Sequence, residues 1–191
     1  MKNTVTETFN IDVPIFAFSH CRDVVAAVSK AGGFGVLGAV GHSPDALEID
    51  LKWIEDEIGE HPYGVDLIVP AKYEGSDEGG LTVHKIANMI PDAHHEYVTE
   101  ILEKYDVPEL AETKSGQFSM KNDGAAPMSA GTAGPQLEIA LAHNPSLVVN
   151  ALGPPPQFMI DQVKEAGRKV GALAGKAQHA ERHVNAGVDL I

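Results

Sequence analysis

The 191-residue sequence has little cysteine and no long apolar run. Its single cysteine, Cys21, cannot form an internal disulfide, and residues 1–10 lack the charged-then-apolar order of a signal peptide. The best apolar run, residues 147–152, is far shorter than the ~20 residues that cross a bilayer. These absences argue against a disulfide-built or membrane-spanning protein, and they predict a cytoplasmic one.

Basic residues are also scarce, because 14 Lys and Arg stand against 27 Asp and Glu and leave a net charge of -13. Such a charge repels nucleic acid and anionic lipid surfaces. We therefore expect no nucleic-acid or membrane partner, and expect small molecules or other copies of the chain in a homo-oligomer instead. With 43% apolar residues, the chain is long enough for one domain with a sizeable core.

A helical pattern that ends in Ala-Gly, followed by a short apolar run, recurs along the chain. Glycine accepts the left-handed conformation that stops a helix, and the strand then turns back along the core. The pattern predicts strands at residues 13–18, 34–41, 63–70, 146–153, 169–175 and 188–191. Helices are predicted between them, at residues 22–31, 44–58, 136–143, 157–166 and 178–186. This alternation is typical of a parallel sheet covered by helices.

Residues 71–135 interrupt the alternation of strands and helices, and this segment is several times longer than a strand-to-strand crossover requires. Asp92 supplies a helix cap and precedes an apolar stripe made of Val98, Ile101, Leu102 and Tyr105. Residues 115–134 are small, polar and glycine-rich, which predicts a loop. We expect this insertion after strand three to form a separable lid over the domain.

The choice between an open sheet and a barrel rests on a missing motif and on length. A dinucleotide-binding sheet would carry Gly-x-Gly-x-x-Gly after its first strand, but the turn AFSHCRD has no glycine. A (β/α)₈ TIM barrel typically takes ~250 residues, and six strands plus the insertion already fill this chain. We therefore predict a (β/α)₈ barrel of which about six βα units are present, and expect the natural polypeptide to continue past Ile191.

The segments PIFAFSHCRDVVAAVSKAGGFGVLGA, SPDAL, YGVDLIVP and AERHVNAGVDLI resemble the nitronate monooxygenase family, formerly called 2-nitropropane dioxygenases. The resemblance covers residues 13–70 and 136–191. It implies a (β/α)₈ barrel that holds FMN at the carboxyl ends of its strands and oxidises alkyl nitronates with molecular oxygen. Two alternatives stay open: an FMN-dependent enoyl-thioester reductase on the same barrel, and a non-catalytic partial-barrel scaffold.

The sequence departs from the family pattern in three ways. The first strand of the family usually ends in a Gln-Ala-Pro-Met-like segment, whereas here FAFSH is followed by a shorter turn, so Ala17, Phe18 and Ser19 are assigned by position only. The third strand of the family usually carries Asn-Leu, whereas here it carries Asp66-Leu67. A carboxylate beside a flavin would disfavour the reduced anion unless it were protonated or paired. The family's glycine-glycine-histidine run follows strand six, which places the expected catalytic histidine beyond Ile191. The 191 residues alone are therefore expected to be inactive.

Barrel active sites form where strands end and βα loops begin. His20, in the first such loop, is a weak candidate acid or base. Asn150 interrupts an apolar strand and needs a hydrogen-bond partner, and Lys176 ends a strand where a cation could face the flavin or a nitronate. No metal site is predicted, and Cys21 is expected to be a buried or partly buried structural thiol. The predicted cofactor-binding residues are Ala17, Phe18, Ser19, Asp66, Asn150 and Lys176.

Overall fold

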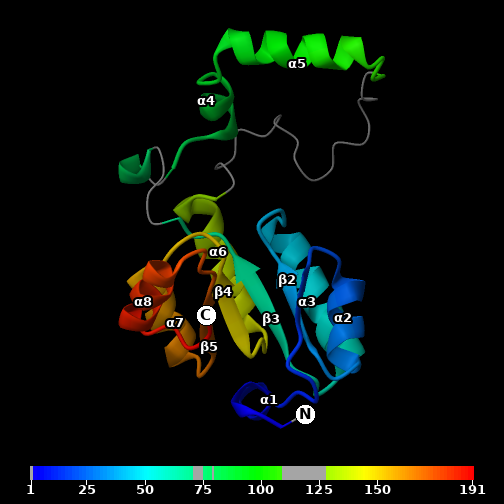
Figure 1. Ribbon diagram of the computed structural model, residues 1–191, viewed down its shortest axis with the longest axis vertical. Coiled ribbons are helices and arrows are strands. Elements are labelled where there is room, and N and C mark those ends of the chain that lie inside the picture. The colour runs from blue at the N-terminus through cyan, green and yellow to red at the C-terminus, as the bar shows by residue number, and fades with distance from the viewer. Residues whose placement is uncertain (1, 71–74, 79, 109–127) are drawn as a thin grey trace.

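The computed structural model describes residues 2–70, 75–78, 80–108 and 128–191, and its central feature is a parallel sheet. The strands follow one another across the sheet in chain order, β1-β2-β3-β4-β5 (Figure 1). Their bounds are β1 Phe16–Ser19, β2 Phe34–Gly38, β3 Tyr63–Leu67, β4 Leu147–Asn150 and β5 Lys169–Ala172. An open doubly wound sheet would reverse its strand order at a switch point, whereas a barrel wall adds strands in sequence. The predicted α/β fold with barrel-type strand order is confirmed.

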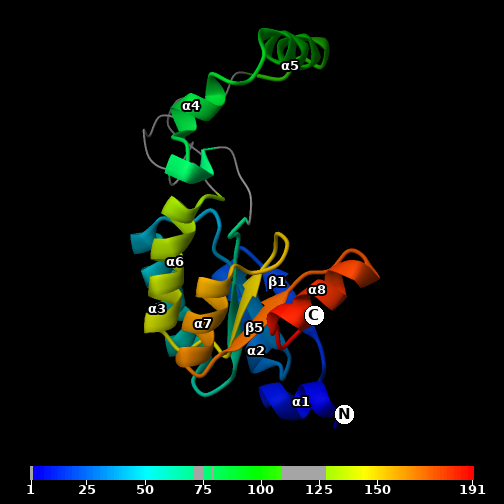
Figure 2. The same cartoon turned by 90° about the vertical axis from the view of Figure 1, so that its left-hand side faces the viewer.

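Helices from the βα units cover the outer face of this sheet (Figure 2). Side chains from α2, α3, α6 and α7 pack with outward-facing residues such as Leu37, Val65 and Val148 in the larger of two hydrophobic clusters. The helix bounds are α2 Arg22–Lys30, α3 Pro44–Ile58, α6 Ala130–Ala142, α7 Gln157–Glu165 and α8 Ala177–Ala186.

The α3 helix shows how local sequence sets an element. Ser43 Oγ accepts a hydrogen bond from the Ala46 N–H, Pro44 occupies the first turn, and Gly59 ends the helix with a φ of 60°. All four apolar residues of the predicted stripe are buried, namely Leu47, Leu51, Ile54 and Ile58. The predicted helix and its core-facing side are therefore confirmed.

A second, smaller cluster fills the inner face of the sheet near the amino ends of the strands. It centres on Phe9 and Phe34, whose rings meet edge to face at 5.1 Å, with Phe16 beside both. Phe9 ends α1 (Thr4–Phe9), a helix that the sequence analysis missed although Asn3 and Thr6 form a capping box. Figure 1 shows α1 below the sheet, where it closes this end of the inner face.

Several element boundaries differ from the prediction, and β2, β3, β4 and β5 each end three residues earlier than expected. Residues 188–191 form one parallel bridge, between Leu190 and Gly171, so the described part of the chain has five strands and the predicted sixth strand is wrong. The first strand starts at Phe16, because the N–H groups of Asp12 and Val13 bind the Gly32 carbonyl. The α6 helix begins at Ala130, so residues 130–134 are helical and do not belong to the predicted loop.

The described part of the insertion comprises η1 (Ser76–Glu78), α4 (Val83–Ala87) and α5 (Asp92–Lys104). These elements lie beyond the carboxyl ends of the strands, at the end of the molecule opposite α1 (Figure 1). The helix expected here is confirmed, but the predicted cap is wrong, because Pro91 is the N-cap residue and Asp92 is the first residue of the helix. Residues 115–127 of the predicted loop lie outside the described residues. Among the described helices, none has the length and apolar content needed to span a bilayer.

Candidate functional site

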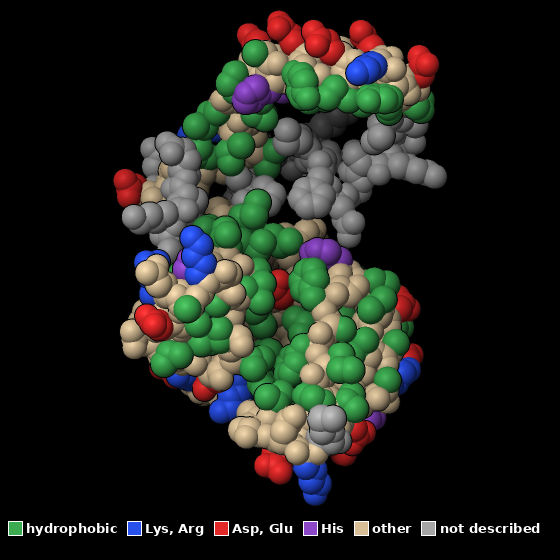
Figure 3. Space-filling view, viewed as in Figure 1, with side chains coloured by type: hydrophobic (Ala, Val, Ile, Leu, Met, Phe, Trp, Pro, Cys, Tyr) green, Lys and Arg blue, Asp and Glu red, His purple; other side chains and the backbone are tan. Residues whose placement is uncertain are grey.

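A cavity of about 480 Å³ opens on the inner face of the sheet above the aromatic cluster. Because side chains alternate along a strand, one residue in two faces inward, and these residues are almost all apolar here. Figure 3 shows hydrophobic side chains lining the hollow between the two halves of the body. The walls include Phe16, Phe18, Val36, Leu147, Val149 and Leu173.

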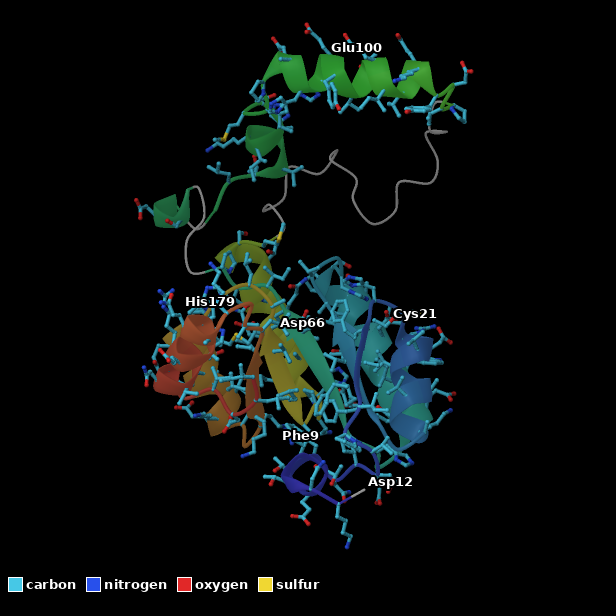
Figure 4. The ribbon with its side chains drawn as sticks, viewed as in Figure 1. Phe9, Asp12, Cys21, Asp66, Glu100 and His179 are labelled. Atoms are coloured by element: carbon cyan, nitrogen blue, oxygen red, sulfur yellow. The ribbon has the colours of Figure 1, made fainter. Side chains whose placement is uncertain are left out.

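Asp66 is the exception in this apolar wall. Asp66 lies on β3, in register with Gly38 on β2 and Val149 on β4, and 7% of its surface is exposed to solvent. Figure 4 shows it at the middle of the hollow, above Phe9. Its Oδ1 is buried and has no hydrogen-bond partner among the described residues. Burial raises the pKa of the Asp66 carboxyl from 3.8 to about 7.

The end of β1 forms one rim of the cavity. Phe18 lines the cavity and meets the His20 ring edge to face at 5.0 Å, and His20 Nδ1 donates to the Gly38 carbonyl at 2.8 Å. A Cβ at Gly38 would lie 2.6 Å from Phe18 Cζ and 2.7 Å from His20 Nδ1, so any side chain here would displace these two rings. Ala17 and Ser19 alternate with Phe18 and face away from the cavity.

Asn150, at the end of β4, is fully buried, and both ends of its amide bind backbone groups. Its Oδ1 accepts from the Val69 N–H at 2.8 Å, while its Nδ2 donates to the carbonyls of Val69, Leu152 and Gly153 at 3.2–3.3 Å. The side chain thus joins the loops that follow β3 and β4. This arrangement fixes the position of the cavity rim, and both polar atoms of the amide are bonded to backbone groups.

Lys176 lies after β5 as the N-cap residue of α8 and is exposed. Beside it, a smaller cavity of about 400 Å³ is lined by the loops after β4 and β5 and by the first turns of α8. His179 and Arg182 line this smaller cavity, and the buried His183 donates from Nε2 to the Leu173 carbonyl at 3.0 Å. The sequence analysis missed these three residues, although their i, i+3, i+4 spacing after a strand end was the available signal.

All the predicted site residues thus lie at or just beyond the carboxyl ends of four parallel strands. Phe18 and Asp66 share the main cavity. Asn150, the last residue of β4, and Lys176, on the turn after β5, do not line it, and neither does His20, whose ring contacts Phe18. Among the described residues, no group of three or more His, Cys, Asp or Glu side chains could hold a metal ion. The expectation of a buried or partly buried Cys21 is wrong, because the thiol is exposed at the start of α2.

Another cavity, of about 420 Å³, lies at the opposite end of the sheet, and the Glu55 carboxylate in its wall is already paired. Glu55 accepts hydrogen bonds from the Tyr63 hydroxyl, the Asn144 N–H and His143, and His143 also binds Glu48. Burial of the His143 ring opposes its charge, but the two carboxylates outweigh this and raise its pKa. In barrels this end serves stability, so we assign the chemistry to the other end.

Comparisons with known proteins agree with this geometry. The chain is 45% identical over 191 residues to Rv1533 of Mycobacterium tuberculosis, a monooxygenase by name, covering 100% of this chain and 50% of that protein. It is 26% identical over 195 residues to a protein of Staphylococcus saprophyticus named as a probable nitronate monooxygenase, again covering 100% of this chain and 48% of the relative. The chain therefore spans about half the length of these relatives.

Solved structures share its fold. Nitroalkane oxidase from Streptomyces ansochromogenes matches with a TM-score of 0.62 at 20% identity, over 98% of this chain and 47% of that one. FabK from Thermotoga maritima matches with a TM-score of 0.61 at 18% identity, over 100% of this chain and 43% of that one. Both are TIM barrels of which this chain covers somewhat less than half. Since the family model for nitronate monooxygenase matches residues 2–191, this chain belongs to the nitronate monooxygenase family.

Proposed function

We propose that the protein to which this chain belongs oxidises alkyl nitronates with molecular oxygen, using FMN bound at the carboxyl ends of the strands. The observation that carries this proposal is the 480 Å³ apolar cavity with one unpaired carboxyl group, Asp66, in its wall. Cofactor and small-molecule sites are concave and mostly apolar, with a few placed polar groups. Family membership supports an oxidoreductase of this type.

The residues present fit a flavin ring system. Phe18, Val36 and Val149 offer flat apolar surface, and the cavity volume lies within the usual range for cofactor sites. Gly171 also lines the cavity, in register with Val149, and adds no polar group to its wall. The orphaned Asp66 Oδ1 supplies a polar contact that no described residue satisfies.

The proposed roles follow from placement. Phe18 and the strand side chains hold and desolvate the ring system, while Asn150 fixes the loops that frame it. Bound FMN would supply the redox chemistry, accepting electrons from the nitronate and passing them to oxygen. Lys176 provides an exposed cation on the neighbouring turn, suited to attract an anionic nitronate. The insertion of residues 71–135, whose described helices lie over this end, is proposed to cover the site.

The test compares two reactions of the purified full-length protein. Oxygen consumption with propyl-2-nitronate should exceed NAD(P)H oxidation with an enoyl thioester by orders of magnitude. The reverse ranking would favour the reductase alternative, and inactivity in both assays together with failure to bind FMN would favour a scaffold. In the first assay, Lys176→Met tests the proposed role of the cation. This variant should lower the rate at limiting nitronate, and an unchanged circular dichroism spectrum is the control for folding.

A further inference from the structure

Asp66 occupies a position that a charged carboxylate tolerates poorly. Its side chain is buried on the inner face, and among the described residues lining the main cavity it is the only ionisable one. Desolvation of an unpaired carboxylate is costly, and proteins usually compensate with a cation or several N–H donors. Asp66 Oδ1 has neither, because no described group donates to it.

The groups around Asp66 explain this lack of compensation. The facing residues on β2 and β4, Gly38 and Val149, carry no charge. From the end of β1, His20 approaches, but its Nδ1 is used by the Gly38 carbonyl. Lys176, the N-cap residue of α8, does not line this cavity. Burial raises the pKa of Asp66 to about 7, so both protonation states of its carboxyl are accessible near neutral pH.

We infer that Asp66 contacts the flavin as a neutral carboxylic acid, donating a hydrogen bond to a carbonyl oxygen or unprotonated ring nitrogen, and that flavin binding is therefore gated by its proton. This inference rests on the proposed function, since it takes the ring system as the ligand of the cavity. A protonated carboxyl has one donor to offer, whereas a carboxylate only accepts and repels those ring atoms. Binding should thus require uptake or retention of one proton at Asp66.

The test measures binding without turnover. Dissociation constants of FMN and of riboflavin are determined by fluorescence quenching on the flavin-free full-length protein, from about pH 6 to about pH 8. If only the protonated form binds, the constant should rise about tenfold over this range for a group titrating near its middle. Riboflavin lacks the phosphate, so its curve removes the titration of that group from the comparison.

Two variants isolate the carboxyl. Asp66→Asn keeps the shape and an N–H donor but cannot ionise, so its dissociation constant should change less than about twofold over the same range. Asp161→Asn, on the exposed face of α7, should keep the wild-type slope. Asp66→Ser is a second neutral variant, should the asparagine protein not fold, and it should also lose the slope.

The outcomes separate this inference from the function on which it rests. Tight flavin binding with a pH-independent constant in the wild type, or parallel curves for wild type and Asp66→Asn, would overturn the proton gate and leave the proposed function standing. Absence of flavin binding at every pH in every variant would overturn both. A wild-type slope that disappears only in the Asp66 variants supports the inference.

Discussion

Replacement of Asp66 by asparagine should change how the stability of the fold depends on pH. The folded-state pKa of Asp66 is raised from 3.8 to about 7, so the folded protein holds a proton that the unfolded chain has already released. The contribution of Asp66 to the free energy of unfolding is therefore fully present below about pH 4, and it is lost as the pH rises toward about 7. Roughly three pKa units at about 1.36 kcal/mol each give a loss of up to about 4 kcal/mol.

Urea unfolding of the flavin-free full-length protein, followed by circular dichroism from about pH 4 to about pH 8.5, measures this effect. The free energy of unfolding of the wild type should fall by up to about 4 kcal/mol relative to Asp66→Asn by about pH 7, and the two curves should run parallel above that. Asp161→Asn is the control and should follow the wild type. A difference between wild type and Asp66→Asn that stays constant over the whole range would refute the reasoning.

Three further substitutions test the frame around the site, each through the free energy of unfolding. Asn150→Ala should lower it by about 2–4 kcal/mol, because buried backbone groups of the two joined loops lose their partners; a change below about 0.5 kcal/mol would contradict this. His143→Gln should cost about 1 kcal/mol at pH 6 and less at pH 9, because the stability from the raised histidine pKa is present at low pH and lost as the ring deprotonates; an equal cost at both pH values would oppose it. Gly35→Ala should destabilise the fold by at least about 2 kcal/mol, because the new Cβ would overlap the Val25 backbone; wild-type stability would show that α2 and β2 can separate freely.

The fold was largely predictable because its signals are local and repeated. Helix α3 carries an N-cap serine, a first-turn proline, a buried stripe and a terminal glycine, and the structure uses all of them. Helix α1 was missed because its main support is tertiary, through the contact of Phe9 with inner-face aromatic rings. The start of α6 was missed because residues 130–134 belong to the small, glycine-rich stretch that predicted a loop, although Ser129 caps the helix and Pro135 lies inside it.

The sequence could predict that the candidate site lies at the strand ends, but it could not predict the hydrogen-bond partners of the residues there. A carboxylate or amide within an apolar strand signals a special environment, and this reasoning selected both Asp66 and Asn150. Sequence spacing could not show that the amide of Asn150 binds the loops while Asp66 Oδ1 is left unpaired. It also could not show that Phe18 faces the cavity and Ser19 faces away, because that depends on the register at which β1 meets β2.

The visible absorption spectrum of the purified full-length protein, recorded before and after anaerobic addition of propyl-2-nitronate, tests the central claim most directly. The account predicts flavin bands in a one-to-one ratio with protein and their loss when the nitronate is added. A colourless protein that takes up no FMN would contradict the assignment of the cavity. Flavin that stays oxidised with the nitronate but is bleached by NAD(P)H would contradict the proposed reaction.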